Sequence, residues 1–136
     1  MDYDDSKSVN KIAKILQKNY SCENGYVLNF QRTDNFSSFD LIDYKSQMVV
    51  EVKQRQIYSY TYPSTMIGYN KIIKARDYLK KGFIVFFVFD FLDGVFFYQF
   101  GEDESDLSID LGGRTDRGVS EIKNYAYIDI SKLQPL

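Results

Sequence analysis

The chain has 136 residues, of which 44% are hydrophobic, and this length suits one compact domain with its own core. It contains no His and one Cys, which excludes His-dependent catalytic dyads and triads, an intramolecular disulfide and a zinc site of the usual Cys/His kind. The net charge of −2 excludes a protein that attracts nucleic acid or anionic membranes through its overall charge alone.

The N-terminal segment is predicted to form a helix. Residues 1–5 are acidic and polar, unlike a signal peptide. Val9, Ile12, Ala13 and Leu16 then recur at the spacing of one helix face, which predicts an amphipathic helix over residues 6–20.

Three stretches rich in aromatic and β-branched residues follow, and we predict strands over residues 26–31, 39–44 and 48–53. The short polar connection at residues 45–47 indicates a hairpin between the second and third strands. If Lys45 and Ser46 form its turn, the numbers of paired residues sum to 91, so Asp40 lies opposite Glu51. Lys53 then shares the face of Glu51, because side chains alternate along a strand.

A second helix is predicted to begin near Ser64 or Thr65, either of which could cap it, and to end before Gly82. Its spacing predicts two stripes of side chains. The expected core stripe is Tyr69, Ile72, Ile73 and Leu79, and the expected outer stripe is Lys71, Lys74, Tyr78 and Lys81.

The C-terminal half is predicted to consist of strands. Residues 83–91 are nearly all apolar, as in a central strand that is covered on both faces, and Asp93-Gly94 indicates a tight turn into a strand over residues 95–100. An acidic loop over residues 101–122 and a strand over residues 125–130 complete the chain. The order α-β-β-β-α-β-β predicts one α/β domain over residues 1–136, with a mixed β-sheet flanked by helices.

The charges are distributed unevenly along the chain. Residues 45–81 contain eight Lys/Arg and two acidic residues, so this segment carries +6 and the remainder carries −8. Residues 86–110 contain seven acidic residues and no basic one. This asymmetry predicts one positive face.

The expected hairpin brings two carboxylates and an ammonium group together. Opposed like charges destabilise a sheet, and a divalent cation between Asp40 and Glu51 would remove that conflict. With no His available, the oxygen ligands favour Mg²⁺, Mn²⁺ or Ca²⁺, and the carbonyl of Val52 could add a third ligand. Lys53 could orient a water molecule or neutralise developing charge. The alternative interpretation is an ordinary salt-bridge cluster on the surface of the sheet.

Asp40 followed by Glu51-x-Lys53, within the element order of residues 6–100, resembles the PD-(D/E)XK nuclease superfamily and its small virus, phage and junction-resolving members. The resemblance implies a restriction-endonuclease-like fold and hydrolysis of phosphodiester bonds with Mg²⁺ or Mn²⁺. It implies that Asp40 and Glu51 bind the metal and that Lys53 is the catalytic lysine. Many members carry an acidic residue on the first helix, and Gln17 is the candidate for that place here.

Further basic residues are candidates for substrate binding. Arg55 shares the face of Glu51 and Lys53, and Lys71 and Lys74 would contact phosphates if their stripe flanks the site. Each could instead be an ordinary surface charge. A second Glu-x-Lys match, residues 121–123, lacks a paired Asp and is interpreted as a solvated pair.

Taken together, these features predict a Mg²⁺-dependent deoxyribonuclease, with an endonuclease favoured over an exonuclease. Two symmetric sites could cut both DNA strands, so a homodimer is expected. The most apolar run, residues 83–89, is too short to span a bilayer, which favours a soluble, cytoplasmic protein without a membrane partner. The family resemblance adds a viral or phage origin as an expectation. The alternative is a non-catalytic nucleic-acid-binding or assembly module on the same fold.

Overall fold

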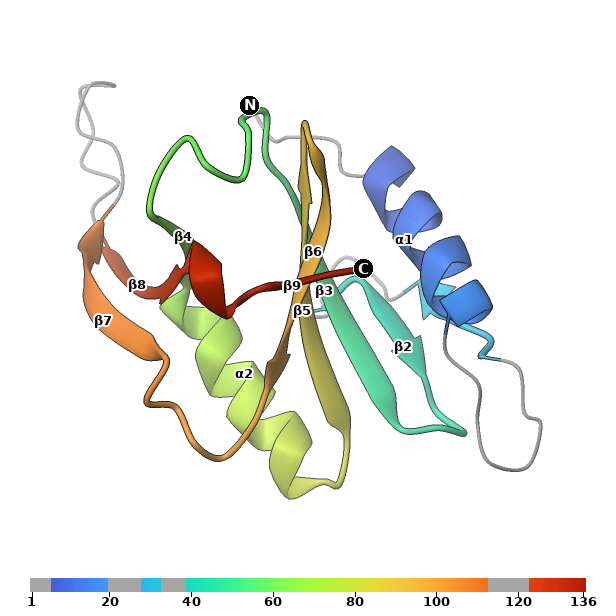
Figure 1. Ribbon diagram of the computed structural model, residues 1–136. Coiled ribbons are helices and arrows are strands. Elements are labelled where there is room, and N and C mark those ends of the chain that lie inside the picture. Colours follow the sequence, from blue (N-terminus) through green and yellow to red (C-terminus); the bar gives the residue numbers. More distant parts are fainter. Residues whose placement is uncertain (1–5, 20–27, 33–38, 113–122) are drawn as a thin grey trace.

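A computed structural model describes residues 6–19, 28–32, 39–112 and 123–136. Within these residues it contains two α-helices, a short 3₁₀ helix and two β-sheets (Figure 1). The elements run in the order α1 Ser6–Asn19, β1 Gln31–Arg32, β2 Leu41–Asp43, β3 Met48–Gln54, β4 Ser64–Gly68, α2 Tyr69–Lys80, β5 Ile84–Phe91, β6 Gly94–Phe100, β7 Leu107–Gly112, β8 Lys123–Asp129, η1 Ile130–Lys132 and β9 Gln134–Pro135.

The larger sheet has the strand order β1-β2-β3-β5-β6-β9. Strands β3 and β5 are parallel and lie at its centre, and the other pairs are antiparallel. From Val85 to Phe91, β5 is buried throughout, as its continuous apolar run predicts. The mixed α/β architecture is that of a restriction-endonuclease-like fold, as expected from the sequence.

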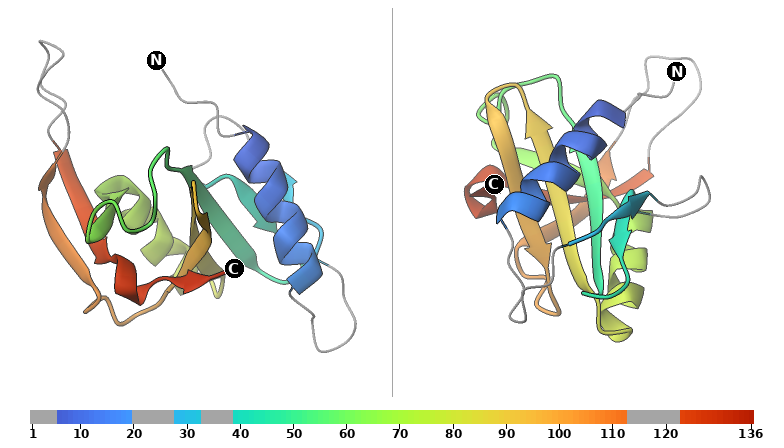
Figure 2. Two further views of the ribbon diagram at one scale, coloured as in Figure 1. Left: turned by 45° about the horizontal axis from the view of Figure 1, so that its top comes forward. Right: turned by 90° about the vertical axis from the view of Figure 1, so that its right-hand side faces the viewer.

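The larger sheet separates two hydrophobic cores (Figure 2). Helix α1 covers one face with Val9, Ile12 and Leu16, which are buried as the helical spacing predicts. Helix α2 and the small sheet β4-β8-β7 cover the other face. Because side chains alternate along β3, Val50 and Val52 point to the α1 core, whereas Glu51 lies on the α2 side.

The predicted register of the β2–β3 hairpin is confirmed. The observed pairs are Leu41 with Val50, Ile42 with Val49 and Asp43 with Met48, so the paired numbers sum to 91. The turn covers residues 44–47, where Gln47 adopts a φ of 54°. Asp40, one position before Leu41, therefore comes to the level of Glu51.

The predicted start of the second helix is wrong. Ser64–Gly68 forms strand β4, in which Thr65 and Ile67 are buried while their neighbours are partly exposed, and α2 begins at Tyr69. Gly68, rather than Ser64 or Thr65, is the N-cap residue. The strand forms because β8 pairs with it from a distant part of the chain.

The predicted stripes of this helix are wrong in part. Ile72 and Ala75 are its buried residues, whereas Ile73 is 50% exposed. Lys71 and Tyr78, expected on the outer stripe, face the larger sheet: Lys71 contacts Glu51, and Tyr78 packs on the ring of Phe39. The helix is therefore rotated about its axis relative to the predicted orientation, so that Ile73 lies outside the buried face.

Several other strand boundaries differ from the sequence predictions. Residues 28–30 lie outside any strand, the short β1 covers only Gln31–Arg32, and residues 26–27 lie outside the described part. The expected acidic loop contains β7, and its residues 113–122 lie outside the described part. The β5–β6 hairpin is confirmed, with Leu92 and Asp93 between the paired residues Phe91 and Gly94. No helix among the described residues is both long and apolar enough to cross a membrane.

Candidate active site

Asp40 is attached to β3 by its backbone and its side chain. Its amide donates to the carbonyl of Val50 (3.1 Å), and its Oδ2 accepts a hydrogen bond from the amide of Val52 (2.8 Å). These bonds lie on either side of Glu51 along β3. The preceding residue, Phe39, is buried against Phe87 and Tyr78, which anchors the chain just before the carboxylate.

Glu51 is a buried carboxyl group that interacts with three charged side chains. Only 2% of the residue is exposed, and its pKa is raised from 4.5 to about 7, mainly by burial. The charge of Asp40 and a hydrogen bond with it contribute to this increase, and Lys53 and Lys71 oppose it. Both Nζ atoms lie 3.2 Å from Glu51 Oε2. The cluster is only partly accessible, because the side chains of Lys53 and Lys71 are 30% and 21% exposed, whereas Glu51 is buried.

Lys71 reaches this site from the first turn of α2. Its side chain is 21% exposed, and its Nζ lies 6.0 Å from the centre of the Phe39 ring. The ammonium group is therefore held between an apolar ring and a carboxyl group on the face that α2 presents to the sheet. Lys74, one turn later, is exposed on α2.

A cavity of about 280 Å³ opens beside the two lysines, and we call it the site hollow. Basic side chains surround it, and the Arg55 guanidinium donates through Nη2 to the carbonyl of Met66 (2.8 Å). A Cβ on Gly68 would lie 2.7 Å from Asn70 Oδ1, so a larger residue here would require the Asn70 side chain to move. The site hollow is lined by Lys53, Arg55, Met66, Gly68, Asn70, Lys71 and Tyr125.

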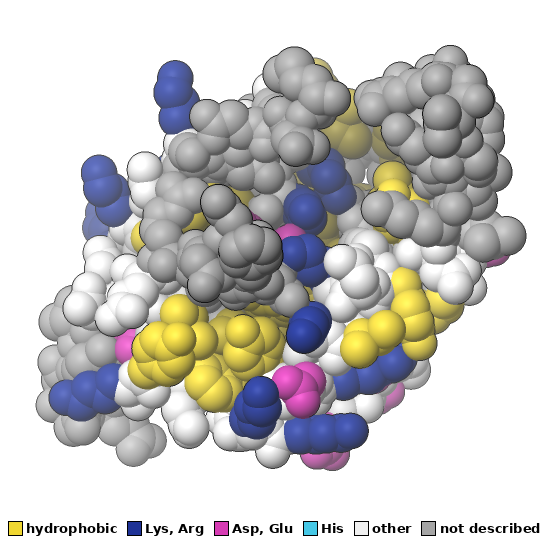
Figure 3. Space-filling model, turned by 180° about the vertical axis from the view of Figure 1, so that it is seen from behind, with side chains coloured by type: hydrophobic (Ala, Val, Ile, Leu, Met, Phe, Trp, Pro, Cys, Tyr) yellow, Lys and Arg dark blue, Asp and Glu magenta, His cyan; other side chains and the backbone are white. Residues whose placement is uncertain are grey.

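Basic side chains gather on one face of the molecule. Figure 3 shows Lys and Arg side chains in a row across the middle of one face, with hydrophobic side chains on both sides. This distribution agrees with the positive face predicted from residues 45–81. A surface of this kind attracts polyanions locally even though the net charge is −2.

Gln17 lies near the C-terminal end of α1. Its Nε2 donates to the carbonyl of Leu28 (2.9 Å), which ties the helix to the segment before β1. Its assignment to the place of a first-helix acid stays a prediction. Nearer the start of α1, Ser8 and Lys11 bind the carboxylate of Asp90 at 2.7 and 2.8 Å on the α1 side of the sheet.

Some residues of the site were missed by the sequence reasoning. Tyr125, Met66 and Gly68 line the site hollow because β4 pairs with β8, and no local pattern indicates that pairing. Lys71 was assigned to substrate binding but not to Glu51. The several lysines of α2 indicated that one of them could reach the site. Which lysine does so depends on the rotation of the helix about its axis, which places Lys71 beside Glu51.

The donor set suits a hard divalent cation. Two carboxyl groups, Asp40 and Glu51, lie together, and the backbone carbonyl of Val52 is adjacent in sequence. Among the described residues, no group of three or more Asp, Glu, His or Cys side chains is placed to hold a metal ion. Mg²⁺ commonly uses one or two protein carboxylates and takes its other ligands from substrate and water, so this small set fits it.

One comparison with known proteins identifies a family. A family model described as "Phage putative PDDEXK endonuclease" matches residues 2–136. No curated protein matches the chain.

Proposed function

The chain belongs to the phage putative PDDEXK endonuclease family, and from this membership we propose that it is a metal-dependent endonuclease that hydrolyses phosphodiester bonds in DNA. The observation that carries the proposal is the buried Glu51 carboxyl group, which meets Asp40, Lys53 and Lys71 beside a basic hollow. A buried carboxylate is costly to a protein unless it is paired with opposite charge or binds a metal ion.

Mg²⁺ or Mn²⁺ is the proposed cofactor, with Asp40, Glu51 and the Val52 carbonyl as its ligands. When bound, the metal polarises a phosphoryl oxygen and lowers the pKa of a water molecule. The elevated pKa of Glu51 supports this assignment, because a divalent cation would favour the ionised carboxylate that burial disfavours.

The basic residues have different proposed roles. Lys53, next to Glu51, orients the attacking water and stabilises negative charge on the phosphate. Lys71 and Arg55 hold the phosphates of the strand in the site hollow, and Lys74 extends this contact along α2. A cation at Glu51 would replace the ammonium groups as the partner of the carboxylate and allow both lysines to turn to phosphate.

The proposal includes three statements about context. The protein acts as a homodimer, since two symmetric sites would cut both strands of a duplex. It acts in the cytoplasm of an infected cell, in line with the phage family. Gln17, whose Nε2 donates to the carbonyl of Leu28, is the proposed residue at the place of the first-helix acid.

The test is cleavage of plasmid DNA in Mg²⁺ or Mn²⁺ by the wild type and by Asp40→Asn, Glu51→Gln and Lys53→Met. Each substitution is expected to lower the rate at least about a hundredfold, as the loss of one stabilising group in an active site typically does. Lys81→Met, which removes an exposed lysine paired with Asp77, is the control and keeps the wild-type rate.

Wild-type cleavage by Lys53→Met or Asp40→Asn would contradict the assignment. If the wild type binds DNA in a salt-sensitive manner but cleaves none, the non-catalytic nucleic-acid-binding module replaces the endonuclease. Circular dichroism of each variant shows whether a loss of rate reflects unfolding.

A further inference from the structure

A second cavity, of about 390 Å³, adjoins the site hollow, and we call it the tyrosine hollow. Arg55 and Met66 line both cavities, so the two hollows share a wall. Beyond that wall the lining is mainly apolar and aromatic, with Ile57, Tyr62, Pro63 and Tyr127. Its volume lies within the range of about 300–1,000 Å³ that is typical of small-molecule pockets.

The pairing of β4 with β8 places one tyrosine in each hollow. Gly68 pairs with Tyr125, and Met66 pairs with Tyr127. Residues two apart on a strand share a face at a spacing of about 7 Å, so Tyr125 and Tyr127 lie one after the other along the same surface. Tyr125 lines the site hollow and Tyr127 lines the tyrosine hollow.

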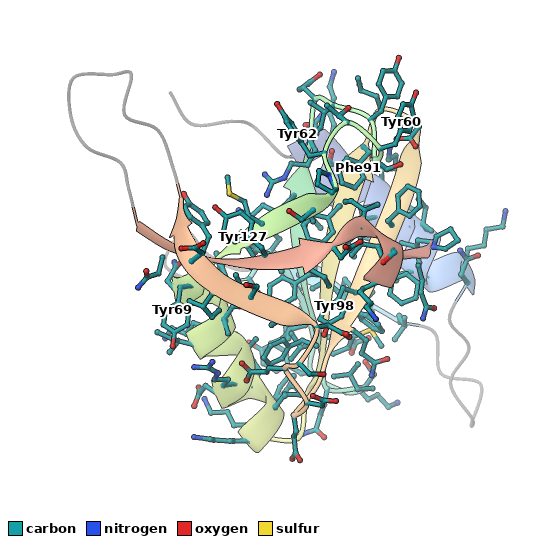
Figure 4. The ribbon with its side chains drawn as sticks, turned by 60° about the vertical axis from the view of Figure 1, so that its left-hand side comes forward. Tyr60, Tyr62, Tyr69, Phe91, Tyr98 and Tyr127 are labelled. Carbon is teal, nitrogen blue, oxygen red and sulfur yellow. The ribbon has the colours of Figure 1, made fainter. Side chains whose placement is uncertain are left out.

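The other aromatic wall comes from the loop over residues 55–63. Tyr62 is 61% exposed, and Figure 4 shows it on this loop above Tyr127. The loop is anchored where Ser59 binds Asp93 through its amide and hydroxyl groups, and where the carbonyl of Pro63 accepts from the amide of Ile130. The two rings are therefore presented from fixed elements, which limits the entropy lost when a ligand binds.

The two hollows differ in chemistry. The site hollow carries Lys53, Arg55 and Lys71, which suit phosphate. Among the described residues that line the tyrosine hollow, Arg55 alone is charged. Aromatic side chains stack on the faces of nucleobases with little dependence on sequence. A nucleotide combines a phosphate, which suits the site hollow, with a base whose flat face suits the tyrosine hollow. A single sugar joins the two.

We propose that the tyrosine hollow binds an unpaired nucleobase of the substrate strand, stacked on Tyr62 and Tyr127, while the adjoining phosphate lies in the site hollow. This inference rests on the proposed nuclease function and names its substrate class. Bases in a duplex are already stacked on one another and would have to leave the helix to enter the hollow. The preferred substrate is therefore DNA with a single-stranded tail or flap next to the cleaved bond.

The test measures binding without cleavage, by fluorescence anisotropy of the full chain in EDTA. The probes are a duplex with a short single-stranded tail and the same duplex with blunt ends. Tyr62→Ala and Tyr127→Ala are expected to weaken binding of the tailed probe about tenfold, within the range measured for loss of one stacked base, and to leave the blunt probe unchanged.

Two further variants separate stacking from other effects. Tyr62→Phe keeps the ring and is expected to bind the tailed probe like the wild type. Tyr44→Ala removes an exposed tyrosine from the β2–β3 turn, outside both hollows, and is the matched control. With 2-aminopurine in the tail, the wild type and Tyr62→Phe should quench its fluorescence more strongly than Tyr62→Ala.

Equal losses on the tailed and blunt probes, or no loss on either, would overturn the proposal. A tail-specific loss supports it, even if the wild type cleaves no DNA in Mg²⁺, in which case the nuclease function alone fails. Cleavage that depends on Lys53 but is independent of both tyrosines would leave the nuclease function in place and refute the tyrosine hollow.

Discussion

Glu51→Gln is expected to abolish a loss of stability that the metal-free wild type shows as the pH rises. The pKa of Glu51 is about 7 in the folded chain and 4.5 for the unperturbed group, because folding removes its carboxyl group from water. Below pH 4.5 both states hold the proton. Between pH 4.5 and 7 only the unfolded chain releases it, so the free energy of unfolding falls, and above pH 7 the loss is complete.

The size of this effect follows from the shift in pKa. The difference between 4.5 and about 7 corresponds to about 3 kcal/mol, at about 1.4 kcal/mol for each pKa unit. Glu51 is almost completely buried, so solvent screening reduces this value little. Between pH 5 and pH 8 the linkage relation gives a loss of about 2–3 kcal/mol.

The assay is urea unfolding of the wild type and Glu51→Gln in EDTA at several values between pH 5 and pH 8. All other titrating groups are common to both proteins, so the difference between their free energies of unfolding isolates Glu51. Glu104→Gln is the control. Hydrogen bonds from Arg76 lower the pKa of Glu104, so this carboxylate causes no decrease in the free energy of unfolding as the pH rises. If the difference in free energy of unfolding between the wild type and Glu51→Gln stays constant between pH 5 and pH 8, the reasoning is refuted.

Three further substitutions test other parts of the account. Asp90→Ala should lower the free energy of unfolding, measured in urea, by about 2–3 kcal/mol, because the buried Ser8 hydroxyl loses its acceptor and Lys11 loses its carboxylate partner. A decrease below about 0.5 kcal/mol would contradict the anchoring of α1 by Asp90. Gly82→Ala should cost about 1–2 kcal/mol in thermal unfolding, because Gly82 has a φ of +89°, and unchanged stability would contradict that conformation. Lys71→Met should reduce the slope of DNA affinity against salt by about one unit, and an unchanged slope would remove Lys71 from the phosphate contacts.

The register of the β2–β3 hairpin could be predicted from the sequence because two local features determine it. The polar residues 45–47 set the position of the turn, and the period of two then sets which side chains share a face. The proximity of Asp40 and Glu51 follows from these features alone. The burial of Glu51 does not follow, because it depends on α2 covering that face.

The elements that were predicted wrongly depend on contacts between distant parts of the chain. Residues 64–68 form a strand because β8, some 60 residues later, pairs with them. The rotation of α2 was predicted wrongly because both of the adjacent residues Ile72 and Ile73 were placed on the core stripe, whereas only Ile72 is buried. The packing of Ile72 and Ala75 turns Lys71 toward Glu51, which lies on a different element.

The central claim is that Asp40 and Glu51 bind a divalent cation, and a crystal structure with Mn²⁺ tests it most directly. The account predicts an anomalous-scattering peak between these two carboxylates, with Lys53 and Lys71 displaced from Glu51. Mn²⁺ bound elsewhere, for example at the acidic residues 102–106, with both lysines still paired to Glu51, would contradict it.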